Sequence, residues 1–172
     1  DAKAHSDYLL NGGEGTTSWH YTVDDHEIYH HIPDSEVSWN AGDRRQEPGG
    51  NMNGISIELC VNQDGDFEKT FDNGARLTAY LMKAYDLKLD DVQQHNYFNG
   101  KNCPQTIRES GRWQEFLELA VEPFSFLPLP PPSIWRRKNE IGLIFGLFIY
   151  YNTCKALSLE KGMVKALPFA LR

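Results

Sequence analysis

The segment Ile55-Ser56-Ile57-Glu58-Leu59-Cys60-Val61 indicates a central β-strand, and the rest of the fold follows outward from it. Its apolar residues alternate at positions 55, 57, 59 and 61, which leaves Glu58 on the opposite face of the strand. The period then changes to that of a helix over residues 71–87. Leu77, Tyr80, Leu81 and Ala84 form one apolar stripe on this helix, as expected for packing against a sheet.

A β-hairpin is expected before this strand. Residues 19–23 are rich in aromatic and β-branched side chains, and residues 27–32 return as the partner strand after a turn. A long loop over residues 37–53 follows, and loops of this length inside a compact domain are often functional. A short strand is expected before His95, with a last helix over residues 106–119. Strands interleaved with helices predict a mixed α/β layer fold.

The segment His95-Asn96-Tyr97-Phe98-Asn99-Gly100-Lys101-Asn102-Cys103-Pro104 carries the clearest candidate chemistry. Imidazole and thiolate are good zinc ligands, and Asn99-Gly100 can turn the chain so that His95 and Cys103 converge. Lys101 would then lie beside the metal, where an ammonium can stabilise a developing oxyanion. The spacing is not among the strong zinc signatures. A surface loop with an incidental histidine and a half-buried cysteine is therefore the alternative.

Other side chains are candidates for a site, each with a plainer alternative. A carboxylate in a central strand is costly unless it is paired or functional. Glu58 is therefore either a general base that activates a metal-bound water or a residue at the sheet margin that reaches solvent. Trp39 either lines a groove for sugar or peptide or is a half-buried loop tryptophan. His20 is expected to be structural, and His30 and His31 face opposite sides of their strand, so at most one can join a site.

Composition divides the chain in two. Of 172 residues with a net charge of −7, residues 1–122 carry 10 basic and 22 acidic side chains, whereas residues 123–172 carry 7 basic and 2 acidic ones. An acidic main domain argues against nucleic-acid binding. Three cysteines, Cys60, Cys103 and Cys154, do not make a disulfide framework. We expect a main domain over 1–122, followed over 123–172 by a Pro-rich linker and an apolar, basic tail of unknown role.

The tail holds an apolar run over residues 141–151, which is too short to span a bilayer. An edge strand, a helix on the domain and a sticky tail are all compatible with it, and no transmembrane segment is expected. The chain opens on Asp1-Ala2 without a signal peptide or an initiator methionine. Residue 1 is therefore not expected to be the natural start, and export stays open.

Taken in order, five segments resemble the type-2 N-acetylmuramoyl-L-alanine amidases of bacteria and phages, which are related to phage amidase lysozymes and peptidoglycan recognition proteins. The segments are Trp19-His20-Tyr21-Thr22-Val23-Asp24-Asp25, Ile32-Pro33, Trp39-Asn40-Ala41-Gly42-Asp43, Ile57-Glu58-Leu59-Cys60, and His95 with Asn99-Gly100-Lys101-Asn102-Cys103-Pro104. The resemblance covers about residues 1–120, and the ordered set is more specific than any single motif.

The resemblance implies a central mixed β-sheet with flanking helices and a Zn²⁺ ion in an open groove, held by two histidines and one cysteine or aspartate. His95 and Cys103 match the second and third metal ligands. Glu58 matches the catalytic glutamate and Lys101 the lysine that stabilises the tetrahedral intermediate. The implied reaction cleaves the amide between N-acetylmuramic acid and L-alanine in peptidoglycan. The implied place of action is the bacterial cell wall, reached by secretion or by release of a phage endolysin from the cytoplasm.

The chain departs from the family pattern at its start. Members carry the first zinc ligand on an N-terminal strand that ends in a His-Asn-Thr-like motif, and the chain opens just after the place of that strand. His20 matches a family histidine near the site that is not usually a ligand. Residues 148–153 loosely echo the missing strand and are one candidate to fill its position in the sheet. Tyr151 then stands at the position of the histidine, although tyrosine would be a poor replacement ligand. A strand and a ligand are therefore expected to be missing from residues 1–122.

Three function classes remain. The first is a zinc amidase that degrades peptidoglycan. The second is a peptidoglycan-binding module or inactive amidase fragment, which has a groove but no metal because the first zinc histidine is absent. The third is a structural zinc domain, which would need a fourth ligand that the sequence does not offer at matching spacing. Retention of Glu58, Lys101, His95 and Cys103 favours the enzyme, with His20 and Trp39 as candidates for the substrate groove.

Overall fold

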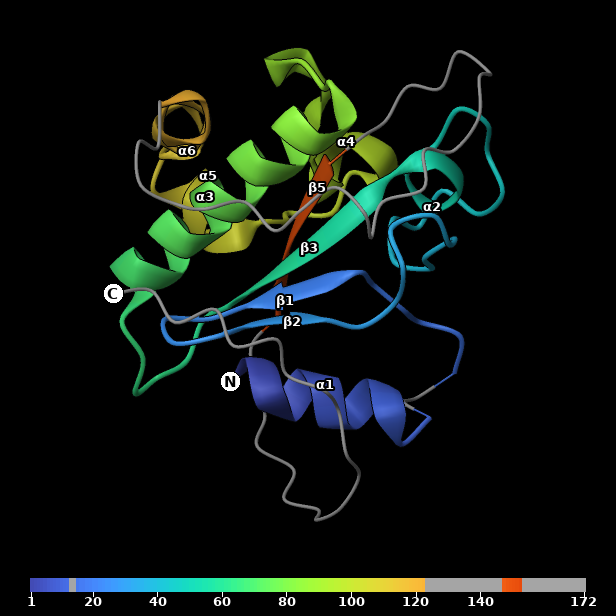
Figure 1. The fold of residues 1–172 in the computed structure, drawn as a ribbon, viewed down its shortest axis with the longest axis horizontal. Coiled ribbons are helices and arrows are strands. Elements are labelled where there is room, and N and C mark those ends of the chain that lie inside the picture. The colour runs from blue at the N-terminus through green and yellow to red at the C-terminus, as the bar shows by residue number, and fades with distance from the viewer. Residues whose placement is uncertain (13–14, 123–146, 153–172) are drawn as a thin grey trace.

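A computed structural model describes residues 1–12, 15–122 and, for the backbone, the strand at 147–152. Its five-stranded sheet has the order β2-β1-β3-β5-β4. The strands are β1 (Tyr21–Val23), β2 (Ile28–His30), β3 (Ile55–Cys60), β4 (Val92–Gln94) and β5 (Leu147–Asn152). Among these described strands, β1 and β2 pair antiparallel and the other neighbours pair in parallel. The predicted α/β fold with a central mixed sheet, flanked by helices, is confirmed (Figure 1).

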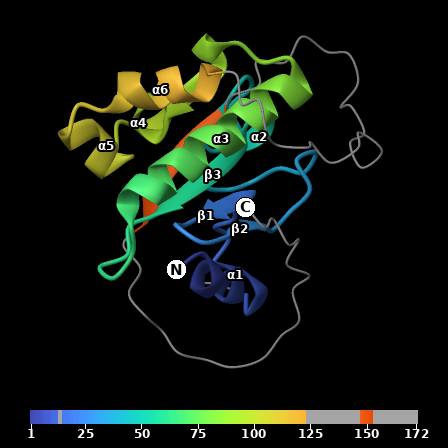
Figure 2. The same ribbon diagram turned by 60° about the vertical axis from the view of Figure 1, so that its left-hand side comes forward.

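Helices cover both faces of the sheet. The long helix α3 (Phe67–Tyr85) and α6 (Trp113–Val121) pack together on one face, while α1 (Ala2–Leu10) lies beneath β1 and β2 on the other (Figures 1 and 2). Three short helices complete the described chain: α2 (Gly50–Asn53), α4 (His95–Asn99) and α5 (Gln105–Glu109). Leu89–Asp91 forms one 3₁₀ turn before β4. No helix in the described part of the chain is long and apolar enough to cross a membrane.

Side chains of β3 point alternately to the two faces of the sheet, and the two faces differ in character. Ile55, Ile57 and Leu59 are buried in a cluster with α3 and α6 side chains such as Phe71 and Phe116. Gly74 of α3 lets the helix approach β3 closely, because a Cβ there would lie 2.6 Å from a methyl carbon of Leu59. The opposite face of β3 carries Ser56, Glu58 and Cys60, toward α1 and the long loops. Glu58 is therefore on the face that α3 does not cover.

Both helical predictions need correction. The helix expected at 71–87 begins at Phe67, because the Asp66 side chain caps it by accepting the backbone N–H of Lys69 (3.2 Å). Its stripe also differs, since Leu77 and Leu81 are buried but Ala84 is exposed. The helix expected at 106–119 is two helices, α5 and α6, separated at Gly111, whose φ is +69°.

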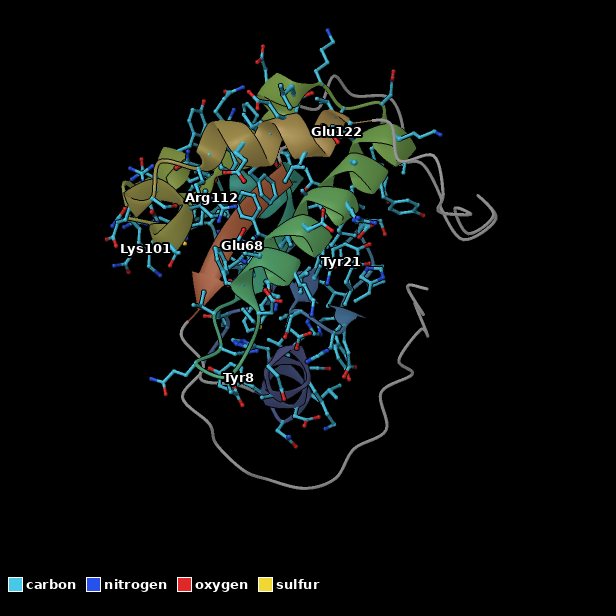
Figure 3. All side chains as sticks on the ribbon, turned by 90° about the vertical axis from the view of Figure 1, so that its left-hand side faces the viewer. Tyr8, Tyr21, Glu68, Lys101, Arg112 and Glu122 are labelled. Atoms are coloured by element: carbon cyan, nitrogen blue, oxygen red, sulfur yellow. The ribbon has the colours of Figure 1, made fainter. Side chains whose placement is uncertain are left out.

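An ion pair fixes α6 to α3. The Arg112 guanidinium bonds both carboxylate oxygens of Glu68, at 2.7 and 2.8 Å, and stacks over the Phe71 ring at 4.2 Å (Figure 3). The same guanidinium also bonds Glu115 within its own helix. A bidentate pair of this kind fixes orientation as well as distance, so α6 is held at one angle on α3.

The tail strand β5 lies inside the sheet. It runs parallel to both neighbours, with Leu147 opposite Ile55 of β3 and opposite Val92 of β4. The sequence offers residues 148–153 as one candidate for the missing strand, and β5 does take an inner position in the sheet. This inner strand differs from the edge strand, the helix and the sticky tail that are compatible with the apolar run at 141–151. Residues 123–146 and 153–172, with the proline run and Cys154, lie outside the described residues. The division into a main domain and an appendage stays a prediction.

The half-buried histidine His31 makes the stability of the fold sensitive to acid. Its Nε2 lies 2.8 Å from Thr22 Oγ1, and burial, followed by the charges of His30, His5 and His20, lowers its pKa to about 4. Between that value and the ordinary value of 6.5 the unfolded chain binds the proton and the folded chain does not. Stability therefore rises with pH in this window and is lost as the pH falls from 6.5 toward 4.

We expect this one histidine to remove about 3 kcal/mol of unfolding free energy between pH 7 and pH 4, from 1.36 kcal/mol per pKa unit. His31→Gln, which keeps a hydrogen-bonding group near Thr22 but cannot titrate, should flatten the profile by that amount. Urea unfolding at pH 7, 6, 5 and 4 measures it. His26→Gln, at a side chain 76% exposed, serves as control and should keep the parental slope. An unchanged slope in His31→Gln would show that His31 is not the titrating group.

Candidate active site

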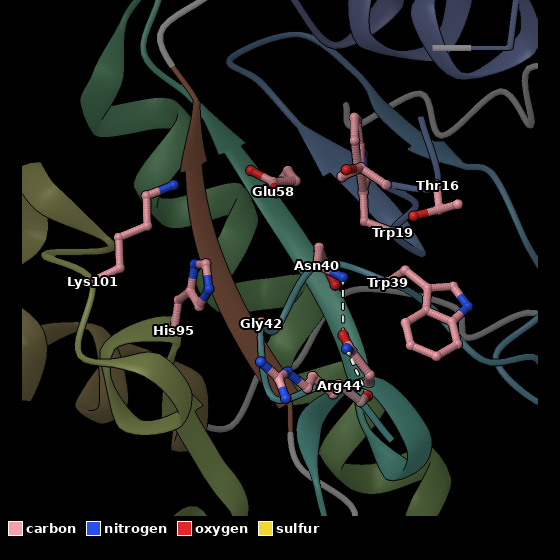
Figure 4. A pocket seen from close by; sticks show the side chains of 11 residues that line it. Thr16, Trp19, Trp39, Asn40, Gly42, Arg44, Glu58, His95 and Lys101 are labelled. Atoms are coloured by element: carbon pink, nitrogen blue, oxygen red, sulfur yellow. Dashed lines mark hydrogen bonds between the residues drawn. The ribbon is translucent and has the colours of Figure 1, made fainter. Parts of the chain in front are cut away.

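One open pocket of about 500 Å³ gathers three of the four residues that the sequence singled out for chemistry. Glu58 comes from β3, His95 from the start of α4, and Lys101 from the loop after α4. Figure 4 shows the Lys101 ammonium and the Glu58 carboxylate facing each other across β5, with the His95 ring beside them. The other lining residues come from the loop between α1 and β1, the loop between β2 and α2, and α2 itself: Thr16, Thr17, Trp19, Trp39, Asn40, Gly42, Arg44 and Asn51.

His95 is held in place through one edge of its ring. Its Nε2 lies 3.1 Å from the Ala41 carbonyl oxygen and 2.7 Å from the Asn99 side-chain nitrogen. Asn99 is itself oriented by the backbone N–H of Lys101, which donates to its oxygen (2.9 Å). Burial and then the Lys101 charge lower the pKa of His95 to about 4, against the smaller opposing effect of the Ala41 hydrogen bond. The imidazole is therefore neutral at neutral pH, the form that binds metal ions.

Cys103 follows His95 along the chain, after the turn at Asn99-Gly100. It is not among the residues that line the pocket. The backbone N–H of Asn96 donates to the Cys103 carbonyl (3.0 Å), which holds the two ends of the segment together. The thiol belongs to a residue only 2% exposed. The turn expected at Asn99-Gly100 is present, with Gly100 at a φ of +76°. His95 and Cys103 are thus two donors of the kinds that zinc prefers, on neighbouring segments.

A third protein ligand is not found with them. Across residues 1–12, 15–122 and 147–152, no three His, Cys, Asp or Glu side chains are grouped so that they could hold a metal ion. An open zinc site uses three protein ligands, and the chemistry of this donor pair accounts for two. The strand between Glu58 and His95 is β5, whose register sets Tyr150 opposite Glu58 and Tyr151 opposite Leu59.

His20 does not line the pocket, in contrast to its assignment to the substrate groove from sequence. It is fully buried, and its Nδ1 accepts the backbone N–H of Ser56 (3.1 Å) while Nε2 contacts the Glu36 carbonyl (3.2 Å). Because Nδ1 accepts, the proton lies on Nε2 and the ring is a fixed link between β3 and the loop. The backbone N–H of His20 also donates to Ser56 Oγ (3.2 Å), two residues before Glu58 on the same strand face.

Trp39 does line the pocket, with the Arg45 guanidinium 5.3 Å from its ring centroid. His30 and His31 do not line it: His30 stacks on Tyr21 (4.3 Å) and contacts Asp34. The sequence missed Arg44 and Asn51, because polar residues in a long loop give no periodic signal. Asn51 is 3% exposed, and its side-chain oxygen accepts the backbone N–H groups of Asn40 (3.0 Å) and Ala41 (2.8 Å).

Comparison with known proteins matches this architecture. Residues 1–106 fit the family described as N-acetylmuramoyl-L-alanine amidase. The chain is 45% identical over 116 residues to the amidase XlyA of Bacillus subtilis, covering 67% of this chain and 37% of XlyA. It is 42% identical over 117 residues to CwlH of the same species, covering 68% and 45%. The chain thus spans less than half the length of these curated relatives.

Solved structures agree with the sequence comparison. The catalytic domain of XlyA superposes with a TM-score of 0.64 at 43% identity, covering 70% of this chain and 75% of that one. PlyL superposes with a TM-score of 0.64 at 28% identity, covering 69% and 74%. The family match over residues 1–106 includes every residue that lines the pocket. This chain belongs to the N-acetylmuramoyl-L-alanine amidase family.

Proposed function

We propose that this protein hydrolyses the amide between the lactyl group of N-acetylmuramic acid and L-alanine in peptidoglycan, and so acts on the bacterial cell wall. The observation that carries the proposal is the meeting of Glu58, His95 and Lys101 in one open pocket, in a chain of this family. The proposed metal is Zn²⁺, with His95 and Cys103 as two of its ligands. When bound, zinc would polarise the scissile carbonyl and lower the pKa of water.

The residues of the pocket have separate tasks in this reaction. Glu58 takes a proton from the attacking water as the new carbon–oxygen bond forms at the amide carbonyl. It then returns that proton to the nitrogen of L-alanine as the carbon–nitrogen bond breaks. The Lys101 ammonium stabilises the negative charge on the carbonyl oxygen of the tetrahedral intermediate. The neutral His95 and the buried Cys103 would hold the metal.

A second candidate function follows from the ligand count. The described residues provide no group of three metal donors, which favours a peptidoglycan-binding module that keeps the groove but does not cleave. Both functions predict binding to cell walls, so binding alone does not separate them. Zinc content and release of new L-alanine amino groups do separate them.

The test uses the full chain, purified after exposure to zinc, and its His95→Ala variant. We expect about one zinc per chain by elemental analysis, lost in His95→Ala, and new L-alanine amino termini when the parent digests purified sacculi. A Cys103→Ser variant should lose zinc in the same way. If the chain binds sacculi but takes up no zinc and releases no amino groups, the hydrolase proposal is overturned in favour of the binding module. Chain that neither binds nor cleaves them would overturn both.

A further inference from the structure

The pocket that holds Glu58 contains two cations, Lys101 and Arg44. Lys101 has a task in the proposed reaction, whereas Arg44 has none. Within the described residues, no carboxylate lies within salt-bridge distance of the Arg44 guanidinium. Figure 4 shows Arg44 among the residues that line the pocket. The described lining holds one carboxylate, Glu58, against these two positive charges. The pocket is therefore suited to a ligand that brings negative charge of its own.

The backbone of Arg44 is held in an unusual conformation. Its φ is +61°, in the left-handed region that non-glycine residues rarely adopt. The side-chain nitrogen of Asn51 donates to the Arg44 carbonyl (2.9 Å). The side-chain oxygen of Asn51 accepts the backbone N–H groups of Asn40 and Ala41. One buried amide therefore holds both ends of this loop turn. The carboxylate of the preceding Asp43 accepts the backbone N–H groups of Gly50 and Asn51. The surrounding contacts thus fix the point from which the guanidinium extends into the pocket.

The substrate class supplies the matching charge. N-acetylmuramic acid loses its own carboxylate in the amide to L-alanine, and the acetamido and hydroxyl groups of the sugar are neutral. The stem peptide beyond L-alanine, in contrast, carries free carboxylates on its second and later residues unless they are amidated. Guanidinium groups bind carboxylates in a bidentate manner, with a geometry that lysine cannot reproduce.

We propose that Arg44 binds a free carboxylate of the stem peptide beyond L-alanine, and so makes the protein discriminate between free and amidated stems. This inference rests on the proposed function for the identity of the ligand. Arg44 is a specificity residue in it, because it lies in the lining but has no part in the bond cleavage. The Arg45 guanidinium is outside the lining, over the Trp39 ring.

The test measures binding and cleavage separately. Binding is measured by calorimetry in the Glu58→Gln background, which blocks turnover. The ligands are N-acetylmuramoyl tripeptides that differ only in amidation: none, the second residue alone, or the third residue alone. A charge-assisted hydrogen bond contributes about 1.5–3 kcal/mol, so we expect amidation of the recognised carboxylate to weaken binding by about 10- to 100-fold. The position that matters identifies which stem residue contacts Arg44.

Arg44→Gln should bind all three peptides alike, at the affinity of the amidated form, and Arg44→Lys should recover only part of the preference. Arg45→Gln removes the same charge one residue away and should keep the full preference. A preference that survives Arg44→Gln, the absence of any preference in the parent, or no binding at all would overturn the inference. A chain with Glu58 intact that prefers the free peptide but does not cleave it would instead overturn the proposed hydrolysis. The carboxylate site at Arg44 would then still be supported.

Discussion

Replacing Glu58 by glutamine is expected to lower the rate of amide hydrolysis by about 10²- to 10⁴-fold, the usual contribution of a positioned general base. The side chain is 5% exposed, on the open face of β3, and lines the pocket with His95 and Lys101. Glutamine keeps the size and shape of the side chain but cannot accept the proton of the attacking water. The measurement is the release of L-alanine amino groups from sacculi at saturating substrate.

Two comparisons make this result specific. Glu58→Gln should keep the zinc content and the sacculus binding of the parent, because Glu58 is not among the proposed ligands. Glu68→Gln, on the outer surface of α3 in the ion pair with Arg112, should leave the rate unchanged. A Glu58→Gln chain that still cleaves at more than a tenth of the parental rate would remove Glu58 from its role as base.

A proline at position 149 is expected to cause the largest structural change. Ile149 pairs with Ile57 of β3 and with Gln94 of β4, in a strand with neighbours on both sides. Proline removes a ladder hydrogen bond and is not tolerated in an inner strand. The buried carbonyl that loses its partner should cost about 1–3 kcal/mol in Ile149→Pro. The variant should also disturb the candidate site, because β5 pairs with both β3, which carries Glu58, and β4, which precedes His95.

Hydrogen exchange of the β3 and β4 amides measures the local effect, and urea unfolding measures the change in stability. Ile149→Pro should lose protection at Val92–Gln94 and also lose sacculus hydrolysis, while β1 and β2 stay protected. Ile149→Val, which keeps a β-branched side chain and the N–H group, is the matched control and should behave like the parent. Unchanged protection of β4 in the proline variant would show that residues 147–152 do not pair there.

The parts of the fold with strong local patterns could be predicted from sequence. Alternation in Ile55–Cys60 identified β3 and placed Glu58 on the opposite face from Ile57, and the hairpin of β1 and β2 followed from its aromatic and β-branched residues. Gly111 did not stand out as a break, because an isolated glycine is also tolerated within helices. An apolar run such as 147–152 fits many strand positions, so its place in the sheet depends on tertiary pairing that periodicity does not encode.

The candidate site shows the same division. His95, Lys101 and Glu58 could be identified because their types suit amide hydrolysis and their order matches a family pattern. Arg44 and Asn51 could not, since their roles depend on a loop conformation fixed by hydrogen bonds between residues 40–44 and 50–51. The sequence left His20 open between a structural role and a place in the substrate groove, and its buried bonds to Ser56 and Glu36 fit the structural role.

The inner position of β5 also sets an order of assembly during synthesis. Strands β1, β2 and β3 and the helix α3 are made early, and their contacts with one another can form as soon as Tyr85 has left the ribosome. The pairing of Leu147 with Ile55 spans about half of the chain, and contacts this distant in sequence form slowly. Glu58 and His95 therefore come into register only when the last described strand is complete. We expect a nascent chain to lack the proposed hydrolase activity until then.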